Sequence, residues 1–380
     1  MRIAYGHTGS DVYDRLFLES LSQEHQVSLL TFSSRPTQVP SGVTVVRMPD
    51  LGWPVEHRDL DRLRIALAQG PRAVTFKRYV ERVNPDILIG NYISTYGLYS
   101  AFSNWHPFAL FAYGSDIVEE PRISPFHRWL AKYVVSKADL ILVDSDIQER
   151  AALRLGAEPG NIMKFPWFNL SECDHVTKDV RFRKMLGWSE KTVVVCVRMH
   201  EKHYKIDTVL RAVPLVLKED QNVRFLLCGT GSQTSRLKAT AKDFGVEDSV
   251  YFAGLLPRRQ VVAVVKGCDI YVSPSQTDGT SASLLEAMSA GLPCLVTDIP
   301  GNKEWIKDEK NGLLFQVGDH EALASLILRL STDNKLRVLL GESAALSIRL
   351  KINWQRDFAR LLGRLTAMNG SQRTVPPNRV

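Results

Sequence analysis

The sequence predicts an α/β protein with two doubly wound parallel sheets, one in each half of the chain. Three observations support this prediction. At 380 residues, the chain is longer than one average domain. Short apolar stretches alternate with helically periodic stretches in both halves, as in repeated β–α–β units. Residues 165–180 contain turn residues and show no period, so we expect the crossing between two domains there.

The first half opens with a strand, a loop, a helix and a second strand, which is how a doubly wound sheet begins. The expected elements of this half are strands at 1–5, 25–32, 87–89 and 108–113, helices at 12–23 and 56–82, and a strand followed by a helix within 140–156. The Gly6–Gly9 loop lacks the third glycine of the dinucleotide-binding motif, so NAD binding is not indicated.

The second half repeats this alternation, beginning with a strand over 192–200 that ends near Arg198. Its other expected elements are strands within 225–228, 250–254, 269–275, 294–301 and 312–317, helices within 320–348, and a last helix at 353–367. The last helix carries an apolar stripe formed by Trp354, Phe358, Leu361 and Leu362.

Composition favours a soluble cytoplasmic protein, with 44% hydrophobic and 23% charged residues. The first residues lack the apolar run of a signal peptide, and no stretch approaches 18 consecutive apolar residues. The five cysteines have no paired spacing. We therefore expect reduced core cysteines, with neither a disulfide framework nor a zinc site.

The net charge of +7 arises entirely from the C-terminal segment. Residues 335–380 hold nine basic and two acidic side chains, whereas the rest of the chain holds 39 of each. A basic helix can approach anionic lipid headgroups at the inner membrane face or an acidic acceptor. A plain alternative is a solvated helix face with a loose end. The segment has no interleaved aromatic residues and no binding motif, so nucleic acid is not an expected partner.

Residues 273–304 carry the clearest functional pattern. Asp278 precedes four small residues at 279–282, and a short helix with Glu286 inside it stops near Gly291. Thr280 or Ser281 suits the N-cap of that helix. The unpaired amides and the dipole at such a helix start bind anions such as phosphate. The alternative is an ordinary capped turn without a ligand.

A nucleotide-sugar ligand would place definite demands on this half. A diphosphate leaving group gathers negative charge, which fixed positive charge and backbone amides stabilise. Arg198 is the best candidate because its fork matches phosphate oxygens, and Lys202 and Lys205 follow closely. Glu286 is placed to accept from ribose hydroxyls, and Asp278 to hold the transferred sugar.

Polar loops follow several strands of the first half, at the edge where ligands of α/β sheets bind. We expect residues 6–10, 90–92 and 113–116 to form one wall of a cleft. Asp144 and Asp146 flank Ser145, and a pair of acids with this spacing can bind a metal ion. A helix N-cap at Ser145 or Asp146 explains them better.

Together these motifs resemble the retaining GT-B glycosyltransferases of family 4, the group 1 type. The family pattern of two acids separated by seven residues matches Asp278 and Glu286, followed by AMSAGLP and later by Gly301 and Glu304. The similarity covers about residues 190–330. It includes the region after Arg198 and the Gly229–Gly231 loop, and it is weaker at the N-terminus and in the last helix.

The resemblance implies two Rossmann-like domains facing a cleft, with the last helix crossing back to the N-terminal domain. We expect an acceptor-side domain over 1–170 together with 352–368, a donor-binding domain over 171–351, and a flexible tail over 369–380. It also implies transfer with retention, without a cofactor or a bound metal, from a UDP- or GDP-sugar. A glycolipid or a growing polysaccharide is the expected acceptor.

The resemblance assigns roles by position. Glu286 matches the acid that binds the ribose, Asp278 the acid near the donor sugar, and Arg198 the diphosphate-binding arginine. The remaining donor-binding residues would be Gly279, Thr280, Ser281, Ala282, Gly229, Gly231 and Lys202. Lys205 joins Asp278 and Arg198 in the expected catalytic set. The acceptor side would include Gly9, Asn91, Tyr113 and Asp116.

Three departures from the family pattern stand out. Asp278 replaces the usual glutamate, Tyr204 stands at the usual diphosphate lysine, and Tyr113 and Asn91 stand where histidines are common. Lys205 or Lys202 can substitute for the missing lysine. These departures keep two alternatives open: a degenerate, non-catalytic nucleotide-sugar-binding protein, and a nucleotide-sugar epimerase.

Overall fold

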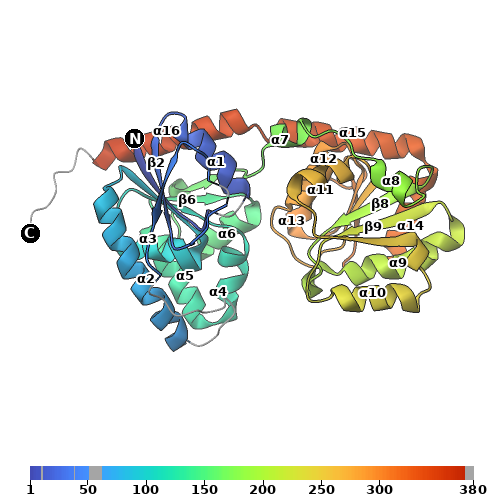
Figure 1. Cartoon of the computed structure of the whole chain (residues 1–380), viewed down its shortest axis with the longest axis horizontal. Coiled ribbons are helices and arrows are strands. Elements are labelled where there is room, and N and C mark those ends of the chain that lie inside the picture. Colours follow the sequence, from blue (N-terminus) through green and yellow to red (C-terminus); the bar gives the residue numbers. More distant parts are fainter. Residues whose placement is uncertain (10–11, 38, 51–61, 373–380) are drawn as a thin grey trace, which may run out of the picture. The chain divides into compact units, whose positions relative to one another are not determined.

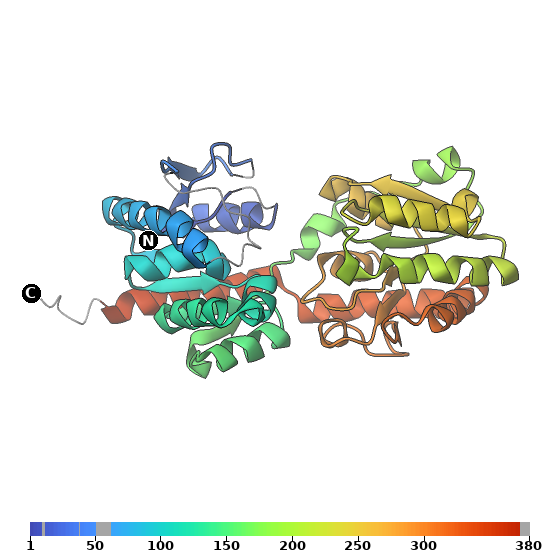
Figure 2. The same cartoon turned by 90° about the horizontal axis from the view of Figure 1, so that it is seen from below.

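The computed structural model describes the whole chain except residues 10–11, 38, 51–61 and 373–380. It divides into two compact units. Unit 1 comprises Met1–Trp167 and Gln355–Val380, and unit 2 comprises Phe168–Trp354. In each unit, helices cover both faces of a central sheet (Figures 1 and 2).

Unit 1 contains a seven-stranded parallel sheet in the order β3-β2-β1-β4-β5-β6-β7. Its strands are β1 (Arg2–Gly6), β2 (Gln26–Thr31), β3 (Val43–Arg47), β4 (Ile87–Asn91), β5 (Phe108–Phe111), β6 (Leu140–Val143) and β7 (Ile162–Lys164). Its helices are α1 (Val12–Ser22), α2 (Arg62–Val83), α3 (Leu98–Ser103), α4 (Glu120–Ile123), α5 (Pro125–Lys137), α6 (Asp146–Leu155) and α16 (Trp354–Gln372). The direction of winding reverses between β1 and β4.

Strand residues of unit 1 alternate between the two helical layers. One face packs against α2 and α3, where Phe76 of α2 is fully buried. The other face packs against α1 and α16, which lie side by side (Figure 1). The Phe17 and Phe358 rings of these two helices are 5.9 Å apart. Leu361 and Leu365 of α16 are also fully buried, so the stripe of the last helix packs onto unit 1.

Unit 2 contains a six-stranded parallel sheet in the order β10-β9-β8-β11-β12-β13. Its strands are β8 (Thr192–Val197), β9 (Val223–Cys228), β10 (Val250–Gly254), β11 (Ile270–Ser273), β12 (Cys294–Thr297) and β13 (Leu313–Phe315). Its helices are α7 (Leu170–Asp174), α8 (Arg181–Met185), α9 (Ile206–Glu219), α10 (Thr234–Asp243), α11 (Arg258–Val265), α12 (Ala282–Ser289), α13 (Pro300–Lys303), α14 (His320–Thr332) and α15 (Asn334–Lys351).

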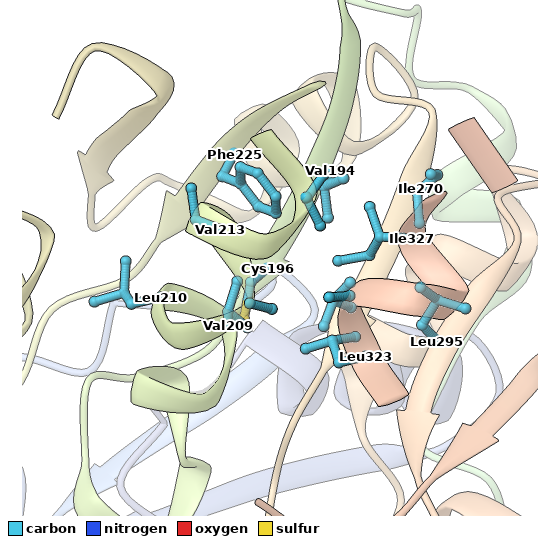
Figure 3. Packing of buried hydrophobic residues seen from close by; sticks show 14 of the residues in the cluster. Val194, Cys196, Val209, Leu210, Val213, Phe225, Ile270, Leu295, Leu323 and Ile327 are labelled. Atoms are coloured by element: carbon cyan, nitrogen blue, oxygen red, sulfur yellow. The ribbon is translucent and has the colours of Figure 1, made fainter. Parts of the chain in front are cut away.

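The core of unit 2 fills the space between its sheet and one helical layer. Figure 3 shows Val209 of α9 and Ile327 of α14 in one cluster with Val194 and Phe225 of the strands. Because this core fixes α9 against β8 and β9, it also fixes the loops that leave the carboxyl ends of those strands.

The strands and helices named from the sequence are present, with several differences. Strands β3 and β7, the edge strands of unit 1, were not predicted from the sequence. Two short helices, α7 and α8, occur in or beside the stretch 165–180, which was expected to be irregular. The helical region 320–348 is two helices, separated by Asp333, which caps the second. The last helix runs to Gln372, into the segment predicted to be a loose tail. The start of the helix predicted at 56–82 lies outside the described residues.

The cysteines behave as expected: all five are free and buried. In the part of the chain that the structure describes, no helix is long and apolar enough to cross a membrane.

Candidate active site

The first functional cluster lies at the carboxyl end of the unit 2 sheet, where β8 and β11 are neighbours. Arg198 follows β8, and its guanidinium donates to Ser273 Oγ at the end of β11 over 2.7 and 3.0 Å. It also forms an ion pair with Asp278, with Oδ2 2.8 Å from Nη2. The strand order reverses between β8 and β11, and doubly wound sheets bind ligands at such a point.

Tyr204, which stands at the position of the usual lysine, contacts Arg198 directly. The guanidinium carbon lies 5.4 Å from the centre of the tyrosine ring, within cation–π range. Burial by itself would lower the pKa of Arg198, but neighbouring Tyr271, Asp278 and Tyr204 raise it above its usual value. Arg198 therefore keeps its positive charge although only 9% of the residue is exposed.

Lys202 and Lys205, the predicted substitutes for the lysine, flank Tyr204 in the sequence. Lys202 lies in the short 3-10 turn Lys202–Tyr204, and Lys205 begins α9 with a left-handed backbone at φ 50°. Both line a small pocket of about 140 Å³ together with Arg211 and Arg236. The side chain that reaches Arg198 from this turn is that of Tyr204.

Gly229 and Gly231 bring the loop after β9 against the loop after β8. A Cβ atom on Gly229 would lie 2.0 Å from the Arg198 carbonyl oxygen, and one on Gly231 would lie 2.7 Å from that of His200. The Gly231 amide donates to Thr234 Oγ1 over 2.9 Å. Both glycines therefore support the backbone around Arg198, and the Gly231 amide is already used within the protein.

Helix α12 begins and ends as the sequence predicts. Ser281 Oγ accepts from the Leu284 amide over 3.2 Å and is the N-cap. At the other end, Gly291 has φ 75°, and the amides of Gly291 and Leu292 donate to carbonyls of the last turn. The short helix thus has a defined start, which is the requirement for an anion site there.

The loop before α12 is supported by Gly301 on α13. Asp278, Gly279 and Thr280 are partly exposed in this loop, and Ala282 opens the helix. A Cβ atom on Gly301 would lie 2.4 Å from the Asp278 carbonyl oxygen and 2.6 Å from that of Gly279. The loop can therefore take this position only because residue 301 is a glycine, which has no side chain to collide with it.

Replacing Gly301 by alanine is expected to weaken nucleotide-sugar binding about tenfold, because the added methyl group must displace the Asp278–Gly279 backbone. Gly363→Ala is the matched control, since a Cβ atom there meets nothing within 4 Å. That change should stabilise α16 by about 1 kcal/mol and leave the affinity unchanged. Calorimetric titration and thermal unfolding measure both effects. An unaltered Kd in Gly301→Ala would contradict the predicted role of the loop.

Glu286 lies within α12 and is 4% exposed. Its Oε1 is 3.4 Å from Nε of Arg258, which begins α11. The Arg258 guanidinium in turn lies over the Phe168 ring, 5.8 Å from its centre. A buried carboxylate held in this way is suited to accept from two neighbouring hydroxyls of a ribose. Sequence reasoning missed Arg258 because no spacing links it to Glu286.

The second functional cluster lies in unit 1, where β1 and β4 are neighbours and the strand order reverses. Asp14 of α1 is fully buried and accepts from Tyr5 Oη over 2.5 Å and from Tyr113 Oη over 3.2 Å. His7, in the loop after β1, pairs with the same carboxylate through Nδ1. With Nδ1 directed at Asp14, Nε2 is the ring nitrogen left for a ligand.

Two predicted acceptor-side residues, Asn91 and Tyr113, belong to this cluster. Tyr113 Oη donates to Asn91 Oδ1 over 2.9 Å, and Asn91 Nδ2 donates to the Gly6 carbonyl over 3.0 Å. The Tyr113 ring is stacked on that of His7, with centres 6.2 Å apart. Gly9 turns the loop after β1 with φ 70°, and a Cβ atom there would lie 2.7 Å from a side chain of β2.

Sequence reasoning missed His7 and Asp14. His7 lay inside the predicted 6–10 loop, and Ser10 of that loop lies outside the described residues. Asp14 lies in α1 three positions before the buried Phe17. An acid near the apolar face of a helix, directly after a histidine-containing loop, is the signal that would have found the pair.

Asp116, the fourth predicted acceptor-side residue, is fully buried. Its carboxylate accepts from the Tyr113 amide over 2.8 Å and from the Ile93 amide over 2.9 Å. It therefore ties the loop after β5 to the loop after β4. Burial raises the pKa of Asp116 to about 7, although the two amide hydrogen bonds lower it.

This raised pKa predicts a pH-dependent contribution to the stability of unit 1. Between the ordinary pKa near 3.8 and about 7, native Asp116 holds a proton that the unfolded chain has released. The contribution is present at low pH and is lost as the pH rises through 7. The stability advantage of the wild type over Asp116→Asn should therefore fall by up to about 4 kcal/mol between pH 4 and pH 8. Urea unfolding at several pH values measures it, and a constant difference would contradict the raised pKa.

The Asp144–Asp146 triplet forms a helix start, as expected. Ser145 is the N-cap of α6 and accepts from the Gln148 amide over 3.4 Å. Asp146 pairs with Lys164, and Asp144 accepts from the Gln148 side chain over 2.7 Å. Among the described residues, no group of three or more His, Cys, Asp or Glu side chains is placed to hold a metal ion.

Two doubly wound parallel sheets, each with polar residues gathered where its winding reverses, define the GT-B class of glycosyltransferase folds. Residues 8–166 match the family described as "Glycosyl transferase 4-like domain", and residues 179–346 match "Glycosyl transferases group 1". The two matches together cover most of the chain: its first half carries a glycosyl transferase 4-like domain and its second half a glycosyl transferases group 1 domain.

Two known proteins illustrate the similarity in sequence. An uncharacterized glycosyltransferase of Methanocaldococcus jannaschii is 24% identical over 61% of this chain and 59% of its own length. The alpha-monoglucosyldiacylglycerol synthase of Streptococcus pneumoniae is 30% identical over 40% of this chain and 34% of its own. The chain thus spans a third to three-fifths of these relatives.

Among solved structures, Anabaena HepE in complex with UDP and glucose is similar in fold. It superimposes with a TM-score of 0.76 at 16% identity, over 96% of this chain and 99% of that chain.

Proposed function

We propose that the chain is a retaining glycosyltransferase that moves a sugar from a nucleotide-sugar donor to a hydroxyl of an acceptor. The observation that carries the proposal is the bonded set of Arg198, Ser273 and Asp278 beside the start of α12, in which Arg198 and Ser273 are buried. It offers a fixed cation for phosphate, a carboxylate for sugar hydroxyls and a helix start for an anion. The buried Glu286 in the same helix adds an acceptor for ribose hydroxyls.

The roles in the reaction follow from this chemistry. The bond from the anomeric carbon to the donor phosphate breaks, and the bond to the acceptor oxygen forms on the same face. The acceptor proton passes to a phosphate oxygen of the leaving diphosphate. Arg198 and the amides of the loop that contains Gly279 and Thr280 would stabilise the charge that develops there. Asp278 would orient the sugar while its pair with Arg198 keeps both groups in place.

The acceptor side of the proposal rests on unit 1. The His7–Asp14 pair, with Tyr113 and Asn91, offers an oriented imidazole and several hydroxyl and amide groups to a polar acceptor. Asp116 would act indirectly, by holding the loops that carry Tyr113 and Ile93. We assign this cluster to acceptor binding.

Donor and acceptor classes are suggested by proteins of similar sequence or fold. UDP occupies the Anabaena structure, and the pneumococcal relative is named for a glucosylated diacylglycerol. We propose a UDP- or GDP-sugar donor and a glycan or lipid-linked acceptor in the cytoplasm, at the inner membrane face where the acceptor is a lipid. The basic C-terminal segment would support contact with that face.

A donor screen tests the proposal. Purified protein is incubated with UDP-, GDP- and ADP-sugars, and donor binding, donor hydrolysis and transfer to acceptor mixtures are followed. We expect one donor class to raise the melting temperature and to be turned over, with activity retained in EDTA. Donor binding without turnover under all conditions would favour the alternative of a non-catalytic nucleotide-sugar-binding protein, which the departures at Tyr204 and Tyr113 leave open. Release of an epimerised donor without a glycoside would favour an epimerase.

A further inference from the structure

Unit 1 contains a pocket of about 470 Å³ among α4, α5 and α6. Its walls include apolar side chains of Ile117, Ile123 and Leu155. Figure 1 labels the three helices, and α5 contacts both α4 and α6. None of the pocket residues belongs to the proposed donor or acceptor clusters.

Three arginines, Arg122, Arg128 and Arg154, line this pocket, which we call the arginine pocket, and no acidic residue does. All three are exposed. Among the described residues, none of them has a carboxylate within ion-pair distance. Among the nearby acids, Asp146 and Glu149 of α6 are both paired with Lys164, and Glu119 and Glu120 precede Arg122 in the chain without an ion pair to it. The pocket therefore presents positive charge that the protein itself does not neutralise.

An aromatic stripe runs along α5 beside the arginine pocket. Phe126, Trp129 and Tyr133 are stacked in sequence, with ring centres 5.9 and 6.1 Å apart. Trp129 is 59% exposed, and Ile123 at the pocket rim is 43% exposed. Tryptophan side chains with cationic neighbours are enriched where proteins meet the headgroup region of a bilayer.

Helix α5 has a buried apolar face and an outward face that carries Trp129 and basic residues. Its inner face is buried and includes Leu130, Val134 and Val135. The whole helix contains Arg128, Lys132 and Lys137 but no acidic residue. The outward face thus combines positive charge with the large exposed ring of Trp129, a pairing that a solvated helix does not require.

We propose that the arginine pocket binds the phosphate of an anionic phospholipid headgroup and holds unit 1 at a bilayer surface. Three arginines around one pocket match a phosphodiester in charge and in hydrogen-bonding geometry. The exposed Trp129 and Ile123 favour a lipid in a bilayer over a free phosphate. Transfer of these two side chains out of water is favourable only if an apolar phase lies beside the pocket, and a bilayer provides that phase. This contact is separate from the one ascribed to the basic C-terminal segment, and it does not depend on transferase activity.

Vesicle flotation of the full chain without donor tests this inference. The vesicles are phosphatidylcholine alone, or phosphatidylcholine with about 30% phosphatidylglycerol. We expect binding to the anionic vesicles only. The triple variant Arg122→Gln, Arg128→Gln, Arg154→Gln should bind about 100-fold more weakly, since each basic residue near an anionic surface contributes about a factor of five. Trp129→Ser alone should weaken binding about tenfold.

The matched control removes the same charge elsewhere. Arg78→Gln, Lys218→Gln, Lys242→Gln changes three exposed basic residues outside the pocket and should reduce binding less than threefold. Equal losses in the two triple variants would overturn the inference, as would unchanged binding of the pocket variant. A third outcome would also overturn the inference. If the protein binds inorganic phosphate or glycerol phosphate, keeps this binding in Trp129→Ser and does not bind vesicles, the ligand is a soluble phosphate. Thermal unfolding of every variant confirms that the fold is retained.

Discussion

Replacing Glu286 by alanine is expected to raise the Kd for the nucleotide-sugar donor about 100-fold. The carboxylate is buried, and a hydrogen bond to a charged group contributes about 1.5–3 kcal/mol. If Glu286 accepts from two ribose hydroxyls, its loss therefore costs about 3 kcal/mol or more. The change also removes the carboxylate that lies 3.4 Å from Nε of Arg258, which makes the charge of this partly buried arginine less favourable.

A donor analogue separates the ribose contact from a general disturbance of the pocket. Calorimetric titration with UDP and with 2′-deoxy-UDP should show a clear penalty for the missing hydroxyl in the wild type and almost none in Glu286→Ala. Glu286→Gln keeps the shape of the side chain and should give an intermediate Kd. Equal penalties in wild type and variant would show that the carboxylate does not bind the ribose, and an unchanged Kd would reject the donor-site assignment as a whole.

Replacing Arg198 by alanine is expected to lower kcat about 1,000-fold with a much smaller rise in KM. A preorganised donor aimed at charge that develops in the transition state contributes about 3–4 kcal/mol in other enzymes. The side chain is fixed for this task by Ser273 and Asp278, and its charge is retained on burial. Arg198→Lys should recover little activity because a lysine cannot contact Ser273, Asp278 and phosphate together.

Two companion variants distinguish catalysis from positioning. Ser273→Ala removes only the hydroxyl that orients Arg198 and should cost about tenfold in kcat. The double variant Arg198→Ala, Asp278→Asn tests whether the loss of kcat in Arg198→Ala arises because Asp278 is left with an unpaired negative charge. Its kcat should stay near that of Arg198→Ala, whereas recovery would assign the loss to the unpaired acid. A change confined to KM would show that Arg198 binds ground state and transition state equally.

The proposed donor half of the site was accessible from the sequence because its residues are close together in the chain. Asp278, the small residues and Glu286 lie within one loop and one helix, so spacing and capping rules predict their local structure. Ser281 is the N-cap and Gly291 follows the helix end in the structure, as the pattern predicts. Arg198 was found for a related reason, since a cation at the end of a strand points to a ligand site.

The acceptor half was less accessible because its chemistry is made by distant residues. Tyr5, Asp14, Asn91 and Tyr113 come from two strands, a helix and a loop, and their contact exists only after β1, β4 and β5 pair. The family pattern at Tyr113 and Asn91 suggested a weakened site. The structure instead places Tyr113 on the fully buried Asp14, which also pairs with His7, and Asn91 on Tyr113.

The sequence by itself determined the fold class, the family and the donor motif, because local periodicity, capping and short spacings are written in contiguous residues. Only the tertiary structure decided which side chains meet across elements. It placed Tyr204 on Arg198, Arg258 on Glu286, and His7 with Asp14. It also left three arginines of unit 1 around one pocket without acids. These pairings depend on strand order and helix packing, which bring together residues that no fixed spacing in the chain connects.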